Sequence, residues 1–407
     1  MKRERWTGTV LAEMSGYSEE IRTTSKGEKN MQTATTIFEP TNIGGLTLNN
    51  RIVMAPMTRS RANVAGMPSD LAVTYYAQRA SAGLIITEGT QPTPAGQGYP
   101  RTPGIHSAEQ IEAWRKITDA VHAKGGRIFL QIMHTGRIAH RLNRTVYRPP
   151  VAPSAIQAPG TIYTDSLGPQ PHSLPRALTT EEIPSVIEEY RRATINALAA
   201  GFDGVELHAA NGYLPMQFLS SNSNQRTDRY GGSVQNRARF VIETLEAMID
   251  GAGSSSKVGL RVSPGNTFND MHDANPVGTH LYLTEEVSPL GLAYLHIQQQ
   301  PKDVHADGVL DPVRMLRPIF DGPIIATGGF DRDSADQLLG KKGADLIGFG
   351  ALFIPNPDLV ERFRSGAPLA PPDAATFYTP GPKGYTDYPV LGTEALVGAL
   401  AAGGRWS

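Results

Sequence analysis

Three polar residues lie within six positions in the stretch 208–213, which reads HAANGY. His208, Asn211 and Tyr213 follow the run GVEL, which is typical of a buried β-strand. A histidine and an asparagine can donate hydrogen bonds to a developing negative charge, and a tyrosine can supply a proton. The same residues can also tie a loop together, so their meaning depends on the elements that position them.

Other apolar runs also carry polar residues at or near their ends. Gln131 ends the run RIFLQ, Arg261 lies within VGLRVS, and Thr58 follows MAPM. A buried guanidinium needs an anion or several hydrogen-bond acceptors. Arg261 therefore indicates either a bound anionic group or a salt bridge to a strand carboxylate such as Glu206 or Glu88. Gln131 has the simpler alternative of satisfying loop backbone.

Eight apolar runs alternate with longer helical patterns along the chain. Most of them are dense in Ile, Val and Leu, as are strands of a parallel sheet that is covered on both faces. The helical pattern of residues 107–126, for example, begins with a serine cap and ends with glycines. Eight βα units predict an α/β fold with a single TIM (β/α)8 barrel. The predicted strands are residues 51–57, 84–89, 127–133, 204–209, 257–263, 294–298, 323–329 and 346–351.

Two long connections, residues 134–178 and 211–232, interrupt this alternation. Both follow strands, so both are expected on the C-terminal face of the barrel, where active sites of this fold are built. One barrel domain with these long loops would span residues 36–391. Residues 1–35 lack the apolar segment of a signal peptide and are predicted to be a disordered extension, and residues 392–407 a C-terminal tail.

The composition excludes several classes of function. The 407 residues carry a formal net charge of -1, which gives no reason to expect nucleic acid or an anionic membrane as a partner. Cysteine is absent, which excludes disulfides, thiolate metal sites and iron–sulfur clusters. No apolar run approaches the ~18 residues of a membrane span. His134, His140 and His296 lack the spacing of a metal site. We therefore expect a cytoplasmic protein with no membrane contact and no metal.

Two glycine-rich strand ends indicate a phosphate site. The seventh predicted strand ends in Gly328 and Gly329, and the eighth ends in Gly350 and Ala351. Glycines there let backbone N–H groups approach an anion, and the loops after these two strands are the usual phosphate site of a TIM barrel. No G-x-G-x-x-G motif follows a strand, so a separate dinucleotide-binding domain is not expected.

A phosphate site and polar strand ends together predict a flat, phosphorylated ligand with polar edges, and FMN fits this description. Arg261 would face the N1/O2 edge of the flavin, where negative charge develops on reduction. Gln131 would bond the pyrimidine edge, and Thr58 would lie near O4 and N5.

At this point the sequence resembles the Old Yellow Enzyme family of FMN-dependent ene-reductases. The resemblance covers roughly Ile37 to Pro389. It implies bound FMN, NADPH or NADH as hydride donor, a small-molecule enone or nitro substrate, and a monomer or homodimer. The stretches that carry it are IFEPTNIGGLTLNNRIVMAPMTRSRA, TEGTQPTPAGQGY, LQIMHTGRIAH, GFDGVELHAANGYLPMQFLSSNSNQRTDRYGGSVQNRARF and TFYTPGPKGYTDYPVL.

The resemblance also implies roles for single residues. His208 and Asn211 would bind the carbonyl oxygen of the substrate, and Tyr213 would donate the proton. The residues implied to contact FMN are Pro56, Met57, Thr58, Gly89, Gln131, Arg261, Gly328, Gly329, Gly350 and Ala351. Those implied to line the substrate pocket, besides His208 and Asn211, are Met133, Phe268 and Tyr378.

The sequence departs from the family pattern at two positions. Ala351 stands where the family usually has an arginine that contacts the FMN phosphate, so FMN binding is expected to rely on backbone amides and on nearby basic residues. Met133 stands where many relatives carry a tryptophan, which predicts tolerance of bulkier substrates. The alternative for Met133 is that it only packs the top of the barrel.

The predicted function is therefore an ene-reductase. Hydride would pass from NAD(P)H through FMN to the β-carbon of an α,β-unsaturated carbonyl compound, and Tyr213 would protonate the α-carbon. Three alternatives stay open: a nitro-ester or nitroaromatic reductase, which does not need Tyr213, a biosynthetic isomerase of the same fold, and a non-catalytic flavin- or ligand-binding protein.

Overall fold

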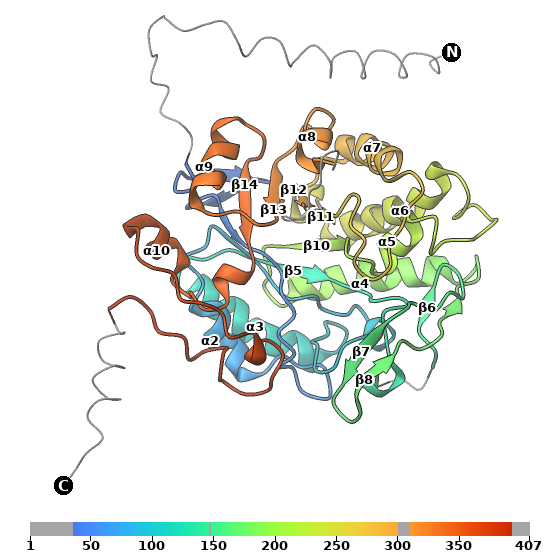
Figure 1. The fold of residues 1–407 in the computed structure, drawn as a ribbon, viewed down its shortest axis with the longest axis horizontal. Helices are drawn as coiled ribbons and strands as arrows, with labels where there is room; N and C mark the ends of the chain where they lie inside the picture. Colours follow the sequence, from blue (N-terminus) through green and yellow to red (C-terminus); the bar gives the residue numbers. More distant parts are fainter. Residues whose placement is uncertain (1–35, 146–147, 300–309, 393–407) are drawn as a thin grey trace, which may run out of the picture. The chain divides into compact units, whose positions relative to one another are not determined.

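Eight parallel strands form a closed barrel in the computed structural model, which describes residues 36–145, 148–299 and 310–392 (Figure 1). The predictions for residues 1–35 and 393–407 fall outside these ranges. The barrel runs in the order β10-β11-β12-β13-β14-β3-β4-β5 and closes through pairing of β5 with β10. The barrel strands are β3 (Ile52–Met54), β4 (Leu84–Ile86), β5 (Ile128–Ile132), β10 (Gly204–Ala209), β11 (Val258–Val262), β12 (Tyr294–Gln298), β13 (Ile324–Thr327) and β14 (Leu346–Phe349).

All eight predicted strands are present, and the TIM barrel is confirmed. Several strands are shorter than the sequence predicted. Gly89 lies three residues beyond the end of β4, and Gly328 and Gly329 lie beyond β13. The last two have φ of 137° and 69°, in the region that favours glycine, so the chain leaves the extended conformation there.

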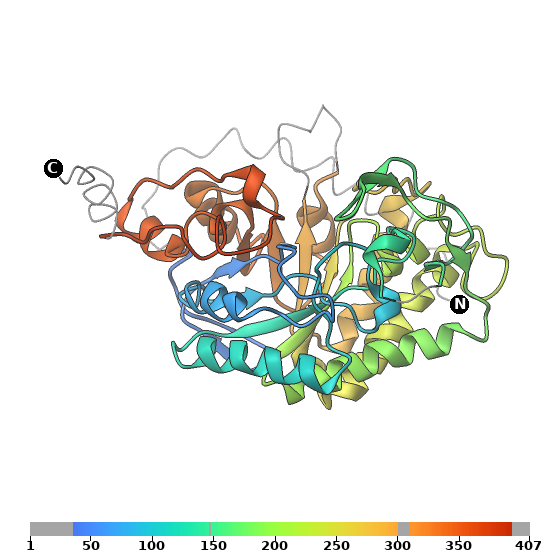
Figure 2. The ribbon, with the colours of Figure 1, turned by 90° about the horizontal axis from the view of Figure 1, so that it is seen from below.

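Helices follow the strands and cover the outside of the barrel, as Figure 2 shows from below. The side chain of Ser107 caps α3 by accepting from Gln110 N, and Gln110 completes the capping box. The helices are α2 (Asp70–Ala77), α3 (Ala108–His122), α4 (Ile183–Ala199), α5 (Leu214–Leu219), α6 (Val234–Ala252), α7 (Pro276–Val287), α8 (Pro312–Leu316), α9 (Arg332–Gly340) and α10 (Leu359–Ser365). Short 3-10 turns are Pro94–Gly96, Arg141–Asn143, Ser255–Lys257, Ser288–Leu290, Ala351–Phe353 and Ala374–Thr376.

Alternating strand residues divide the core into two parts. Val53, Leu84, Phe129 and Leu346 belong to a small inner cluster, while their strand neighbours join the large cluster under the helices. The inner cluster also takes Leu48 and other residues of a hairpin formed by β1 (Thr41–Ile43) and β2 (Leu46–Leu48). The members of the inner cluster lie near the starts of the barrel strands, so this hairpin closes the N-terminal end of the barrel. The polar residues lie toward the C-terminal end.

The long connection after β5 adds small sheets of its own. The pair β6 (Val151–Ala152) and β9 (Arg176–Ala177) is parallel, and β7 (Thr161–Thr164) and β8 (Gly168–Pro171) form an antiparallel hairpin. Among the residues described, no helix is long and apolar enough to cross a membrane.

Candidate active site

A polar layer lies above the inner apolar cluster of the barrel. Strand register places Gln131 beside Glu206, His208 beside Arg261, and Arg261 beside His296. Side chains of parallel strands at the same level and of the same parity point to the same side of the sheet. The predicted site residues of three separate strands therefore meet in the barrel.

Glu206 is the centre of this layer. Gln131 Nε2 donates to Glu206 Oε1 at 2.7 Å, and His296 Nδ1 lies 2.7 Å from Glu206 Oε2. Burial alone would raise the pKa of Glu206, but His296, Arg261 and Gln131 together hold it below its usual value, so the carboxylate is ionised. Because the amide nitrogen of Gln131 faces Glu206, its oxygen is left for another partner. The interpretation that the Gln131 side chain bonds to backbone groups of a loop is wrong, since it donates to Glu206.

Arg261 forms no salt bridge with either carboxylate proposed from the sequence, in the part of the chain that is described. Its Nη2 donates to Gln298 Oε1 at 2.6 Å, while Glu88 accepts from the backbone N–H of Arg59 at 3.1 Å. The Nε atom of Arg261 is buried and has no partner among the described residues. Burial lowers the pKa of the guanidinium. An orphaned buried donor of this kind fits an acceptor edge of a ligand such as flavin.

His208 is a neutral hydrogen-bond donor. Its Nδ1 accepts from the backbone N–H of Ala210 at 3.3 Å, so the proton must lie on Nε2. Burial, helped by the charge of Arg261, lowers the pKa of His208 well below its usual value. The imidazole therefore stays neutral and presents an Nε2–H.

Asn211 lies in the turn after β10 with a φ of 56°, a conformation that asparagine tolerates better than most residues. Its backbone N–H donates to Ser263 Oγ at 3.0 Å, and its carbonyl oxygen accepts from Asn269 Nδ2 at 2.8 Å. The side-chain amide is held by Gln298 and Asn266, each at 2.9 Å. The turn is thus held by residues of two later segments, the loop after β11 and the end of β12.

Tyr213 is the N-terminal flanking residue of α5 and is only 7% exposed. Its ring meets the ring of His208 edge to face at 4.9 Å, and its hydroxyl lies 3.2 Å from the hydroxyl of Tyr99. Burial, with a smaller effect of Tyr99, raises the pKa of Tyr213 well above its usual value. The phenol keeps its proton at neutral pH. His208 and Tyr213 are therefore in contact, and Asn211 lies in the turn between them.

The two glycine-rich strand ends fit an anion. A Cβ at Gly328 would lie 2.5 Å from the carbonyl oxygen of Gln299, so only glycine fits there. The backbone N–H groups of Gly329 and Ala351 have no hydrogen-bond partner in the described ranges. Free N–H groups at the ends of β13 and β14 suit a phosphate. Arg332 on α9 donates from Nη1 to the carbonyl of Phe363 at 2.8 Å, and its buried Nε has no partner among the described residues.

The first strand end lies next to this phosphate site. Residues Pro56, Met57 and Thr58 follow β3, are half-buried, and the side chain of Met57 comes within 3.6 Å of an ideal Cβ on Gly350. Strand β3 pairs with β14, which brings the two loops side by side. The residues predicted to bind a flavin from opposite ends of the chain are thus neighbours.

The predicted pocket residues differ in their surroundings. Met133 is 3% exposed and packs in a cluster with Tyr213, Ile138 and Ile162. A Cβ at Gly89 would lie 2.5 Å from the sulfur of Met133, so this glycine makes room for the methionine. Phe268 and Tyr378 are 57% and 60% exposed. Met133 therefore lies against Tyr213, whereas the side chains of Phe268 and Tyr378 are exposed.

Residues of the site that the sequence analysis missed include Tyr99, Ser263, Asn266, Asn269 and Gln298. Gln298 is a polar residue at the end of a predicted strand, and the rule that found Gln131 would have found it. Tyr99, 114 positions before Tyr213, has no local signal.

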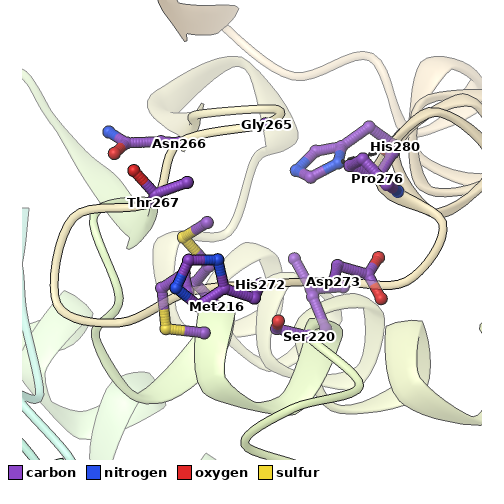
Figure 3. Close-up of a pocket in the computed structure, with 11 residues that line it drawn as sticks. Met216, Ser220, Gly265, Asn266, Thr267, His272, Asp273, Pro276 and His280 are labelled. Carbon is purple, nitrogen blue, oxygen red and sulfur yellow. Dashed lines mark hydrogen bonds between the residues drawn. The ribbon is translucent and has the colours of Figure 1, made fainter. Parts of the chain in front are cut away.

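A hollow lies beside Asn211, and none of the predicted site residues lines it. It has a volume of about 220 Å³, and its walls include Met216, Asn266 and His280 (Figure 3). His280 Nδ1 contacts the carbonyl of Pro276 at 2.8 Å, and its buried Nε2 has no partner among the described residues. Asn266 links this hollow to Asn211.

Residues 36–370 match the family model described as NADH:flavin oxidoreductase / NADH oxidase family. The chain is 42% identical over 361 residues to 12-oxophytodienoate reductase 1 of Oryza sativa subsp. japonica, which covers 87% of this chain and 93% of the rice protein. It is also 42% identical over 363 residues to a probable flavin mononucleotide-dependent alkene reductase of Leishmania infantum, covering 87% of this chain and 97% of the other.

Solved structures of similar sequence have the same fold. Morphinone reductase superposes with a TM-score of 0.84 at 44% identity, covering 89% of this chain and 98% of that one. An old yellow enzyme homologue from Zymomonas mobilis superposes with a TM-score of 0.85 at 41% identity, covering 88% of this chain and 100% of that one.

Proposed function

Since the chain belongs to the Old Yellow Enzyme family of NADH:flavin oxidoreductases, we propose that it is an ene-reductase acting on α,β-unsaturated carbonyl compounds. Membership makes it an NAD(P)H-dependent flavin oxidoreductase with FMN as cofactor. Bound FMN supplies the hydride carrier between the nicotinamide and the substrate. The observation that carries the proposal is the meeting of two neutral donors and one protonated phenol above the polar layer.

His208 and Asn211 act on the carbonyl oxygen of the substrate. Hydride addition to the β-carbon leaves negative charge on this oxygen, and donors already aimed at it stabilise the enolate. Each such donor contributes about 2–4 kcal/mol to lowering the barrier. The neutral state of His208 matters here, since its Nε2–H donates at any pH near neutrality.

Tyr213 delivers the proton to the α-carbon. A buried phenol with a raised pKa keeps this proton until a strongly basic carbon is formed beside it. The hydroxyl of Tyr99, 3.2 Å away, orients the Tyr213 hydroxyl.

The remaining predicted residues would hold FMN. Arg261 would direct its guanidinium toward the N1/O2 edge of the flavin, and Gln131 would offer its amide oxygen to the pyrimidine edge. Thr58 would lie at the O4 and N5 side. The free N–H groups of Gly329 and Ala351 would take the phosphate.

Replacing Tyr213 with phenylalanine tests this assignment. We expect Tyr213→Phe to lower the turnover of 2-cyclohexenone about 10²–10⁴-fold, because the general acid is lost. Reduction of the flavin by NADPH, followed as bleaching of the yellow protein without oxygen, should survive. Tyr163→Phe is the matched control, because this tyrosine is 56% exposed. Undiminished enone turnover in Tyr213→Phe would remove the proton-donor role, and absence of bleaching in the wild type would remove the enzyme.

Reduction of a nitro group is the second candidate. A nitro group offers two acceptor oxygens to His208 and Asn211 and needs no proton from Tyr213. Nitro-ester turnover that persists in Tyr213→Phe while enone turnover is absent even in the wild type would favour this candidate.

A further inference from the structure

We propose that Gln298 is a positioning residue that fixes the polarity of the Asn211 amide and makes Asn211 an obligate hydrogen-bond donor toward the substrate. The proposal rests on the function proposed above and extends it to a residue at the end of β12. Gln298 joins the guanidinium assigned to the flavin with the amide assigned to the substrate oxygen.

The side-chain oxygen of Gln298 accepts two hydrogen bonds. Arg261 Nη2 donates to Gln298 Oε1 at 2.6 Å, and Asn211 Nδ2 donates to the same atom at 2.9 Å. A guanidinium has donors and no acceptor, so Gln298 must turn its oxygen toward Arg261. Only the nitrogen end of the Asn211 amide can then face Gln298.

The other side of Asn211 leads to the same orientation. Asn266 Oδ1 accepts from the backbone N–H of Phe268 at 2.8 Å, and this N–H can only donate. Asn266 must therefore present its Nδ2 to the Asn211 Oδ1, at 2.9 Å. Amide orientations follow from the surrounding hydrogen-bond network. Here the network ends at the Arg261 guanidinium and at the backbone N–H of Phe268, and both groups can only donate.

The count of polar groups shows what remains for a ligand. The backbone N–H and carbonyl of Asn211 are bonded to Ser263 and Asn269, and its Oδ1 is bonded to Asn266. One N–H of Nδ2 is bonded to Gln298. The second N–H of Nδ2 is left, so Asn211 recognises an acceptor oxygen such as that of a carbonyl, enolate or phenolate.

The test uses the FMN-loaded enzyme and 4-hydroxybenzaldehyde, whose phenolate oxygen is a stable analogue of the enolate oxygen. Its Kd is measured from the change in flavin absorbance. Gln298→Met fills similar space without an acceptor and should raise this Kd about tenfold, because the Asn211 amide is no longer held. Gln299→Met makes the same change one residue further, where the described residues give the side chain no hydrogen bond, and should keep the Kd within about twofold.

A double-mutant cycle shows whether the effect passes through Asn211. In an Asn211→Ala background, Gln298→Met should have little further effect on the Kd. An equal loss in both backgrounds, or a wild-type Kd in Gln298→Met, overturns the proposal. A merely structural role would lower thermal stability and leave the Kd unchanged, which also overturns it.

Two further measurements keep the outcome clear. If Gln298→Met does not retain FMN, Gln298→Asn is measured instead. Its shorter side chain moves the acceptor oxygen away from Asn211 by one methylene and should also raise the Kd of 4-hydroxybenzaldehyde. An unchanged Kd in a folded, yellow Gln298→Asn would contradict the proposal. Wild-type reduction of 2-cyclohexenone is measured first. If the wild type reduces the enone and the variants bind the phenolate as it does, the positioning role fails and the proposed function stands.

Discussion

Ala351 is the residue whose identity has the clearest consequence for the cofactor. It begins the 3-10 turn after β14, is exposed, and its backbone N–H has no partner among the described residues. An arginine at this place would add a charge-assisted, two-pronged contact to the FMN phosphate. We expect Ala351→Arg to lower the Kd of FMN for the apoprotein about tenfold or more, as measured by quenching of FMN fluorescence.

Riboflavin is the control for this substitution because it has the same ring system without the phosphate. Its Kd should be the same for the wild type and for Ala351→Arg. Tighter binding of riboflavin as well, or an unchanged Kd of FMN, would mean that the side chain at position 351 does not face the phosphate.

At the scale of residues, the sequence predicted the polar side chains at the ends of strands and missed side chains that loops bring to the site. His208, Gln131 and Arg261 could be found because a polar residue is unexpected in a strand that is buried on both faces. The partner of Arg261 was assigned to Glu206 or Glu88 as one alternative, and this was wrong because side-chain partners depend on register between strands. Tyr99 meets Tyr213 only through the folded loops.

At the scale of elements, the segment of residues 374–389 is held to the barrel by Arg59 and Arg61, both of which are buried. Arg61 donates to the carbonyl oxygens of Thr376, Phe377, Gly381 and Lys383, at 2.9–3.0 Å. Its guanidinium also lies 4.5 Å from the ring centre of Tyr385. Arg61 follows Thr58 by three residues, so the same loop approaches the flavin site and holds the segment that carries Tyr378.

Removal of the Arg61 side chain should therefore loosen this segment. Arg61→Ala leaves four carbonyl oxygens without their charged donor, and we expect the free energy of unfolding to fall by about 3 kcal/mol. Limited proteolysis should cut within residues 374–389 faster than in the wild type. Arg364→Ala is the control, because Arg364 is 56% exposed and its nearest carboxylate is 4.0 Å away. Equal cutting rates in both variants would argue against the role of Arg61.

At the scale of the whole molecule, the eight-stranded barrel was predictable because a short run of branched apolar residues marks most strands. The lengths of the strands were not predictable, since Gly328 and Gly329 continue the sequence pattern of β13 but adopt positive φ. The hairpin of β1 and β2 that closes the barrel was not predicted either. Its apolar residues Ile43 and Leu48 are too few to mark an element, and only the closed barrel gives them a place to pack.

The dependence of stability on pH is set in part by one carboxyl that joins the barrel to the 59–61 segment. Glu88 is 5% exposed and accepts from the backbone N–H of Arg59. Burial raises the pKa of Glu88 from 4.5 to about 7 in the folded protein. Between these two values the folded protein keeps a proton that the unfolded chain has already released. The contribution of Glu88 to the free energy of unfolding is therefore fully present at low pH. It falls as pH rises from about 4.5 to about 7 and is constant above that.

We expect Glu88→Gln to remove this dependence, because an amide resembles the protonated carboxyl and can still accept from Arg59. A shift of this size corresponds to roughly 3 kcal/mol, so the variant should match the wild type below about pH 4 and be more stable by up to that amount at pH 8. Urea unfolding with saturating FMN at each pH measures the difference. Glu246→Gln on α6, an exposed position, should run parallel to the wild type at every pH. A parallel curve for Glu88→Gln as well would mean that Glu88 is ionised in the folded protein and that Arg59 and Arg61 compensate its burial.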